Sequence, residues 1–289
     1  SVVIPTHLRS ASVEAALRSF DSQDLERSRF ELIVVSNLED QNVQRIMAEA
    51  GSRGLDVKHI VVGQIGVNRA RNAGLELAKG DVIFFLDDDC RLSRPDHLSQ
   101  LVLRFRAETG FSIRGGLYRD STDATSTARS YNAVVNAWVR GHDRETKMMV
   151  GGNLAVLRSA LGTTRFDEAI VYGGSEVGFQ LELARRGYRS KLDADLAVIH
   201  DFRASVFTVF RKAWRQGYER KPGTGASLAA VAVELAKTRR LAFGLCYGGI
   251  SRVASLSAEL ERSLPFGDRP RILAGDGDAA NELRTRRPR

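Results

Sequence analysis

The chain has 289 residues, of which 43% are hydrophobic, and this is enough to build a sizeable core in one large domain or two smaller ones. Its 43 Lys and Arg residues outnumber its 35 Asp and Glu residues, which gives a net charge of +8, but aromatic residues make up only 7%. This composition argues against a nucleic-acid binder and fits anionic small molecules such as nucleotide phosphates. No apolar run of about 18 or more uncharged residues predicts a transmembrane helix. The two widely separated cysteines suggest neither a disulfide framework nor a zinc motif, so we expect a cytoplasmic protein.

The first 90 residues alternate between apolar runs and helical patterns. Continuous apolar strands separated by helices predict a doubly wound, mainly parallel sheet flanked by helices, which binds ligands beyond the carboxyl ends of its strands. The predicted strands are 1–5, 30–37, 57–63 and 81–87, and the predicted helices are 10–20, 40–51 and 66–80.

The pattern beyond residue 90 is more mixed. We expect helices over 94–108, 126–141 and 175–189, a short strand within 110–120, a strand before a glycine pair within 148–162, and a last strand within 191–201. From about residue 203 the chain reads as helical, including a long run over 226–262, and its end is poor in apolar residues. We therefore predict an α/β domain over 1–200, a helical C-terminal region over 201–270 and a mobile basic tail over 271–289.

The stretch DVIFFLDDDC, residues 81–90, places three aspartates at the end of a buried strand. Along an extended chain Asp87 and Asp89 would project to the same side, away from Asp88. Carboxylates at such a sheet edge suit Mg²⁺ or Mn²⁺, which favour oxygen ligands and commonly bind phosphates as well. A turn or a helix N-cap is the structural alternative, but three consecutive aspartates favour the metal site.

The stretch VNRARNAGLELAKGDVIFFLDDDC, together with SVVIPTHLR ahead of it, resembles the nucleotide-sugar domain of family 2 glycosyltransferases. The resemblance covers roughly residues 1–200 and implies a GT-A fold. It also implies inverting transfer of a sugar from a nucleoside diphosphate sugar, by default a UDP-sugar, with Mn²⁺ or Mg²⁺ as cofactor. The acceptor implied by such a family is a polysaccharide, a lipid, a peptide or a small metabolite.

The resemblance assigns donor-binding roles near the first two strands. The segment VVIPTHLR nominates Pro5, Thr6 and Arg9 for the nucleoside, and a guanidinium such as that of Arg9 can also bind phosphate through two hydrogen bonds. The second strand of the family usually ends in an aspartate that reads uracil, whereas this strand ends in Ser36 and Asn37. Asn37 offers an amide to a pyrimidine edge, but the departure leaves thymidine and guanosine donors open.

The remaining donor and metal residues lie around the three aspartates. Arg69 and Arg71, in a loop that enters a helix, are expected to contact the diphosphate or to support the aspartates. The family's Asp-x-Asp motif maps onto Asp87 and Asp89, with Asp89 as the direct metal ligand and Asp87 as a donor contact and second ligand. Asp88 is expected near the donor sugar. Gly152, in the segment VGGNLAVLRSAL, would allow the backbone to approach the donor closely.

The candidate catalytic base is Glu176. It lies eleven residues before Gly187-Tyr188, where the resemblance places an acid at the start of a helix, although Ser175 replaces the usual first acid of the pair. The alternative is an ordinary acidic residue in the first turn of a helix. His200, at the end of an apolar strand, is a candidate further metal ligand.

Two other functions and several partners stay open. The departures at Ser36-Asn37 and Ser175 fit a catalytically inactive nucleotide-sugar-binding module, and a nucleotidyltransferase would also use a parallel sheet with acidic metal ligands. The apolar C-terminal helices offer a surface for packing within the protein, for a homodimer, or for peripheral contact at the inner face of the membrane.

Overall fold

The computed structural model describes residues 1–141, 148–171, 175–203, 205–219, 243, 246–248 and 250–251. Its strands are β1 (Val2–Thr6), β2 (Leu32–Ser36), β3 (Val57–Val61), β4 (Val82–Phe85), β5 (Cys90–Leu92), β6 (Ile113–Gly115), β7 (Tyr118–Asp120), β8 (Leu154–Leu157), β9 (Ser190–Leu192) and β10 (Val198–His200). Its helices are α1 (Ser10–Arg18), α2 (Gln41–Ser52), α3 (Val67–Leu77), α4 (His97–Ala107), α5 (Ser126–Gly141), α6 (Arg158–Leu161), α7 (Ser175–Arg185) and α8 (Val206–Glu219), with 3₁₀ turns at Arg27–Arg29 and Gly151–Asn153.

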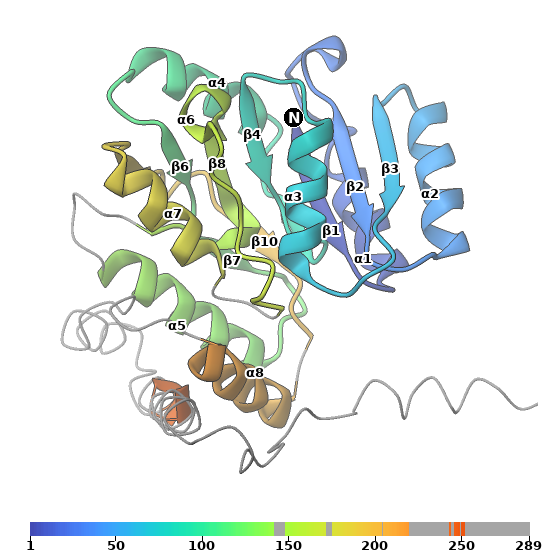
Figure 1. Ribbon diagram of the computed structural model, residues 1–289. Coiled ribbons are helices and arrows are strands. Elements are labelled where there is room, and N and C mark those ends of the chain that lie inside the picture. The colour runs from blue at the N-terminus through green and yellow to red at the C-terminus, as the bar shows by residue number, and fades with distance from the viewer. Residues whose placement is uncertain are drawn as a thin grey trace, which may run out of the picture.

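A seven-stranded sheet forms the centre of the molecule, in the order β3-β2-β1-β4-β8-β6-β9 (Figure 1). The first four strands in this order are parallel, whereas β8 runs antiparallel to both of its neighbours. The predicted α/β architecture with a mainly parallel sheet is therefore confirmed. The arrowheads of β2, β3 and β4 point toward the end of the sheet beside which α5 and α8 lie (Figure 1).

Helices cover both faces of the sheet, because the strands are apolar on both sides. Side chains of α1, α2 and α4 pack on one face against Val2, Ile4 and Phe84. Side chains of α3, α6 and α7 pack on the other face against Val3, Ile83 and Phe85. Continuous burial of β1, β2 and most of β4 leaves the loops at the carboxyl ends as the place for polar residues.

A second, three-stranded sheet in the order β5-β10-β7 brings distant parts of the chain together. His200 of β10 lies opposite Cys90 on one side and Asp120 on the other. The single strand expected within 191–201 is wrong, because two short strands, β9 and β10, belong to different sheets. The split places His200 immediately beside the acidic turn that follows β4.

Other sequence expectations were also corrected. The strand expected before the glycine pair lies after it, as β8, and the region 110–120 contains two short strands instead of one. The domain boundaries stay a prediction. The tail over 271–289 and most of the run over 226–262 lie outside the described residues. Within the part of the chain that the structure describes, no helix combines the length and the apolar character needed to cross a bilayer.

Helix α3 packs unusually close to β1, and Gly74 makes this possible. A Cβ atom added at Gly74 would lie 2.3 Å from Cγ1 of Val3, a side chain that is completely buried. The close approach brings the first turn of α3 down to the carboxyl end of the sheet, where Arg71 meets the acidic turn. The glycine in the NRARNAG segment therefore serves packing.

This close contact predicts opposite outcomes for two helical glycines. Gly74→Ala forces Val3 or α3 to move, so we expect the free energy of unfolding to fall by about 1–3 kcal/mol despite the better helix propensity of alanine. Gly178 of α7 is exposed, and an added Cβ meets nothing within 4 Å, so Gly178→Ala should raise stability by up to about 1 kcal/mol. Urea denaturation of both variants measures the two effects, and equal changes would contradict the packing argument.

Candidate functional site

The three aspartates lie in a turn, not in a continued strand. Strand β4 ends at Phe85, and the amide of Cys90 donates to the carbonyl of Asp87 over 2.9 Å. The bend sends the carboxylates to different partners: Asp87 pairs with Arg71, while Asp88 and Asp89 share Arg9. The expectation that Asp87 and Asp89 project to the same side is therefore wrong, because the chain is not extended here.

Asp88 points into the protein. Its carboxylate accepts hydrogen bonds from the Thr6 hydroxyl and from an Arg9 nitrogen, both at 2.7 Å, and its side chain is 6% exposed. Burial, followed by the neighbouring charge of Asp89, raises the pKa of Asp88 to about 7 against the pull of Arg9. Asp88 thus ties the acidic turn to the end of β1 and the start of α1.

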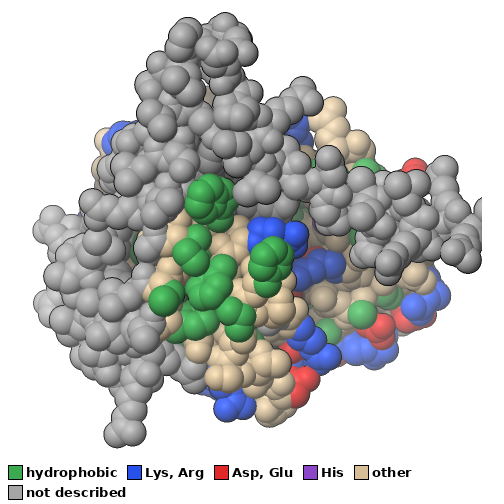
Figure 2. All heavy atoms as spheres, turned by 90° about the horizontal axis from the view of Figure 1, so that it is seen from below, with side chains coloured by type: hydrophobic (Ala, Val, Ile, Leu, Met, Phe, Trp, Pro, Cys, Tyr) green, Lys and Arg blue, Asp and Glu red, His purple; other side chains and the backbone are tan. Residues whose placement is uncertain are grey.

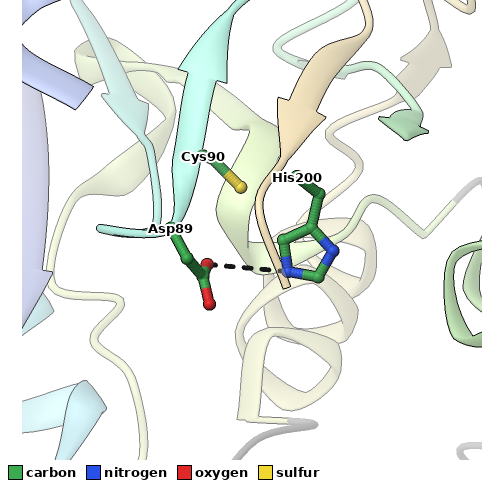
Figure 3. Close-up of side chains that lie close together, drawn as sticks. All are labelled: Asp89, Cys90 and His200. Carbon is green, nitrogen blue, oxygen red and sulfur yellow. Dashed lines mark ion pairs between the residues drawn. The ribbon is translucent and has the colours of Figure 1, made fainter. Parts of the chain in front are cut away.

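Asp89 faces the side chains of Arg9 and His200. Its Oδ2 atom accepts from Arg9 at 3.0 Å, and its Oδ1 atom lies 3.5 Å from Nε2 of His200 (Figure 3). Burial would raise the pKa of Asp89, but His200, Arg9 and Lys212 together hold that pKa well below its usual range. The same two aspartates raise the pKa of Arg9 above its usual value, although burial opposes this.

The Asp89–His200 pair fits a divalent cation. Ligand atoms of Asp89, Cys90 and His200 all lie within 4.8 Å of one another, at the carboxyl end of the central strands. A carboxylate oxygen and a neutral imidazole nitrogen that face each other can both ligate one metal ion. Burial raises the pKa of the Cys90 thiol well above its usual value, so the thiol stays neutral and is a poor ligand for a hard ion. The predicted roles of Asp89 and His200 as metal ligands rest on this geometry.

Asp87 is held in a different way. Arg71, which is 3% exposed, donates to Oδ1 of Asp87 over 2.8 Å. A Cβ atom at Gly152 would lie 2.7 Å from both Oδ2 of Asp87 and the Tyr118 hydroxyl. The backbone at Gly152 therefore lies close to Asp87, while the roles of Asp87 and Gly152 in donor and metal binding stay predictions.

Polar side chains on α3 hold the segment 166–170 against the sheet. Asn72 exchanges hydrogen bonds with the backbone carbonyl and amide of Phe166, and Asn68 donates to the carbonyl of Asp167 over 2.5 Å. The Phe166 ring stacks on Phe179 of α7 with centroids 4.0 Å apart. The contacts of Asn72 with this segment are those of packing.

Arg69 and Arg71 point in different directions. Arg71 supports Asp87, as the sequence analysis allowed, whereas Arg69 is 40% exposed at its side chain and reaches Gln64 and Glu168. Arg69 lines an open hollow of about 420 Å³ whose lining includes none of the three aspartates. The structure therefore does not bring Arg69 to the acidic turn, and its donor-binding role stays a prediction.

The other donor-binding candidates have structural partners. Pro5 is buried within β1, opposite Val35 of β2. The side-chain amide of Asn37 donates to the carbonyls of Gln64 and Gly66, at 2.9 and 3.1 Å, so it fixes the loop that precedes α3. A role for Asn37 in reading a base would have to use its carbonyl oxygen, because both hydrogen bonds of the amide nitrogen go to this loop.

Glu176 lies in the first turn of α7 and is partly buried. Among the described residues no side chain pairs with its carboxylate. One turn later Gln180, which is 1% exposed, accepts from the amide of Met149 at 2.8 Å and donates to its carbonyl at 2.9 Å. Gln180 thus fastens the start of α7 to Met149, just before Gly152, whose backbone lies close to Asp87.

Sequence reasoning missed Gln180 and the contacts of Lys212 with aromatic rings. The buried face of α7 includes Gln180 itself. Lys212 of α8 lies over the rings of Tyr131 and Phe202, at 4.7 and 5.0 Å from their centroids, and contributes to the low pKa of Asp89. A polar residue at a core-facing helical position was the signal available for Gln180.

A mainly parallel sheet covered by helices on both faces is the architecture of the GT-A fold. Residues 1–167, more than half of the chain, match the profile of Glycosyl transferase family 2. The chain belongs to this family.

Individual relatives extend this likeness. The glycosyltransferase AglE of Haloferax volcanii is 33% identical over 92 residues, which cover 31% of this chain and 30% of AglE. The poly(ribitol-phosphate) beta-N-acetylglucosaminyltransferase TarS of Staphylococcus aureus is 21% identical over 142 residues, 45% of this chain and 25% of TarS. The matches thus span less than a third of these curated relatives.

Solved structures agree with the GT-A fold. The mannosyltransferase PcManGT of Pyrobaculum calidifontis, in complex with GDP-Man and Mn²⁺, superposes with a TM-score of 0.60 at 18% identity, covering 98% of this chain and 78% of that one. TarS of S. aureus in complex with UDP-GlcNAc superposes with a TM-score of 0.58 at 15% identity, covering 91% and 81%.

Arg9 pairs with both Asp88 and Asp89, so we expect it to compete with a metal ion for Asp89. Arg9→Met removes a partner of buried Asp88, so we expect the stability of the metal-free protein to fall by about 2 kcal/mol. The variant should gain more in Tm from Mn²⁺ than the wild type, because Arg9 no longer competes with the ion for Asp89. Thermal unfolding with and without Mn²⁺ measures both effects.

Arg18→Met is the matched control, because Arg18 pairs with Glu14 on the exposed side of the same helix. Its stability should change by less than about 0.5 kcal/mol. A gain from Mn²⁺ in Arg9→Met that is no larger than in the wild type would show that Arg9 does not compete for Asp89.

Proposed function

We propose that this chain transfers a sugar from a nucleoside diphosphate sugar to an acceptor nucleophile, with inversion at the anomeric carbon and with Mn²⁺ or Mg²⁺. One observation carries the proposal: Asp89 and His200 face each other across 3.5 Å at the carboxyl edge of the sheet, in a chain of glycosyltransferase family 2. A divalent cation bound there would neutralise charge on the departing diphosphate. Asp87 joins this proposal as a donor contact and a second ligand.

Cationic side chains of the chain itself also favour a diphosphate. Arg9 is 46% exposed at its side chain, and Lys212 carries its charge close enough to Asp89 to affect the pKa of that residue. Both can turn toward phosphate oxygens, since neither is enclosed in the core. In this proposal the nucleoside lies near Pro5, Thr6 and Asn37, at the ends of β1 and β2.

Glu176 is the proposed general base. As the oxygen of the acceptor attacks the anomeric carbon, Glu176 takes its proton, and the bond from that carbon to the diphosphate oxygen breaks. A carboxylate in the first turn of α7 benefits from the helix dipole. Gln180 supports this role, since it ties that turn to the segment whose backbone touches Asp87.

The nucleoside of the donor is part of the proposal. A UDP-sugar is our default because of the family resemblance, and TarS was solved with UDP-GlcNAc. PcManGT was solved with GDP-Man, and Asn37 stands where the family usually has a uracil-reading aspartate. Guanosine and thymidine donors are therefore tested beside uridine.

The exposed face of α8 is the proposed surface for contact with a second copy of the chain or with a membrane. This helix exposes Phe207 and Val206 by 73% and 47%. Seen from the side of α8, the surface carries a group of hydrophobic side chains with lysine and arginine side chains beside it (Figure 2). A homodimer contact or a peripheral membrane contact would use this face. The acceptor remains a polysaccharide, a lipid, a peptide or a small metabolite.

The role of Glu176 is tested by Glu176→Gln, which keeps the shape of the side chain but removes the base. We expect kcat for sugar transfer to fall at least about 100-fold, while the Kd of the donor stays within about twofold. Glu182→Gln, an exposed position on the same helix, is the control and should keep wild-type kcat. Wild-type turnover by Glu176→Gln would remove Glu176 from the base role, and turnover absent from the wild type itself would favour an inactive binding module.

The metal and nucleotide assignment is tested by thermal unfolding with UDP, GDP or TDP, each with and without Mn²⁺. We expect one nucleotide to raise Tm in a manner that depends on Mn²⁺, because binding to the native state adds RT ln(1 + [L]/Kd) to its stability. Asp89→Asn should abolish the Mn²⁺-dependent part. A nucleotide effect that is the same without Mn²⁺, or in Asp89→Asn, would contradict the cation site.

A further inference from the structure

The imidazole ring of His200 is buried and fixed in place by its neighbours. The ring is 3% exposed and lies between Tyr118, with centroids 4.2 Å apart and planes 20° apart, and Phe202, at 5.4 Å and 7°. The next residue, Asp201, donates its backbone amide to the carbonyl of Asp89 over 2.7 Å. Stacking and strand pairing therefore fix the plane of the imidazole and point Nε2 toward Asp89.

Asn132 of α5 contacts the other nitrogen of this ring. It is 1% exposed, its Nδ2 atom donates to Oδ1 of Asp120 over 2.8 Å, and its Oδ1 atom lies 2.6 Å from Nδ1 of His200. A carboxylate only accepts hydrogen bonds, so the amide nitrogen of Asn132 must face Asp120. The amide oxygen must then face His200, so the orientation of Asn132 follows from its two hydrogen-bond partners.

The order of donors and acceptors from Asp120 through Asn132 to His200 determines which ring nitrogen carries the hydrogen. An amide oxygen accepts and cannot donate, so the hydrogen between Asn132 and His200 belongs to Nδ1 of the imidazole. Nε2 of the neutral ring then presents its lone pair to Asp89. A histidine that carried its hydrogen on Nε2 would instead donate to Asp89 and would have no free nitrogen for a cation.

We propose that Asn132 is a positioning residue that sets the tautomer of His200, so that Nε2 can ligate a divalent cation shared with Asp89. The role of Asn132 toward the cation rests on the proposed function. Asp120 orients Asn132 in turn, because His200 and Asp120 are neighbours across the small sheet. Outer hydrogen-bond partners of metal-ligating histidines commonly act in this way, and their loss costs about 10–100-fold in metal affinity.

A purely structural role for Asn132 would predict different partners. Among the described residues, Asn136, one turn further along α5, bonds to the backbone amide and carbonyl of Tyr118, at 2.9 and 2.8 Å, and so satisfies groups of an edge strand. Asn132 instead joins two side chains, and one of them, Asp120, is exposed and can be solvated by water. The contrast makes Asn136 a matched control on the same helix.

The first experiment reads the tautomer in the metal-free protein. Long-range ¹H–¹⁵N correlation spectra are recorded above the usual pKa of imidazole, with His200→Gln used to assign the signals of His200. We expect the hydrogen on Nδ1 in the wild type and in Asn136→Leu, and a shift toward the Nε2-protonated form in Asn132→Leu. A hydrogen on Nε2 in the wild type, or an unchanged tautomer in Asn132→Leu, would overturn the proposal.

The second experiment measures Mn²⁺ affinity from the EPR signal of free Mn²⁺, with UDP or GDP present. Asn132→Leu should weaken binding about 10–100-fold. The exchange of the pair, Asp120→Asn together with Asn132→Asp, keeps an acceptor on Nδ1 and a donor beside it, so it should restore binding to within a few fold of the wild type.

The outcomes separate the two proposals. Unchanged Mn²⁺ affinity in Asn132→Leu, with binding by the wild type, overturns the role of Asn132 alone. Wild-type protein that binds no Mn²⁺ under these conditions overturns the cation site of the proposed function and the role of Asn132 toward it, while the spectra still decide whether Asn132 sets the tautomer.

Discussion

Mutual repulsion of three consecutive carboxylates is the constraint on which this end of the molecule depends. Each carboxylate has partners that offset its charge, and Asp88 and Asp89 share one of them: Asp87 pairs with Arg71, Asp88 with Thr6 and Arg9, and Asp89 with Arg9 and His200. The compensating groups come from α3, β1, the start of α1, and β10. Neutralising the acidic turn therefore draws together segments that are up to about 190 residues apart in the chain, and this defines the site before any ligand binds.

The compensation also assigns the aspartates different tasks. Asp88 has the least exposed side chain of the three, and its raised pKa reflects the cost of that burial. Its role is therefore to hold the acidic turn against β1 and the start of α1. The pKa of Asp89 is lowered, and its Oδ1 atom faces Nε2 of His200; both properties suit a metal ligand. Three acidic residues in a row thus provide one strong candidate ligand, one structural residue and one residue, Asp87, that rests against Gly152 and Tyr118.

The local parts of this arrangement could be predicted from the sequence. Continuous apolar runs predicted β1 to β4, and the helical patterns between them predicted α1 to α3. Both kinds of pattern could be used because they depend only on residues that are close in sequence. Three aspartates after VIFFL marked an acidic cluster at the end of a strand, but not the turn that sends its carboxylates to different partners. The split of 191–201 between two sheets could not be predicted, since it depends on pairing with Cys90 and Asp120, far away in sequence. Asn132 and Gln180 were missed for the same reason: their partners are distant.

Helix α5 shows how much of a site can depend on a segment without any charged ligand. Two asparagines one turn apart reach the same small sheet, and Asn136 fixes the backbone of Tyr118 while Asn132 reaches the ring that Tyr118 stacks on. The position of the imidazole and the position of its proton are thus set from one helix. A metal-binding histidine needs both, because a correctly placed ring with its hydrogen on the wrong nitrogen offers no lone pair to the ion.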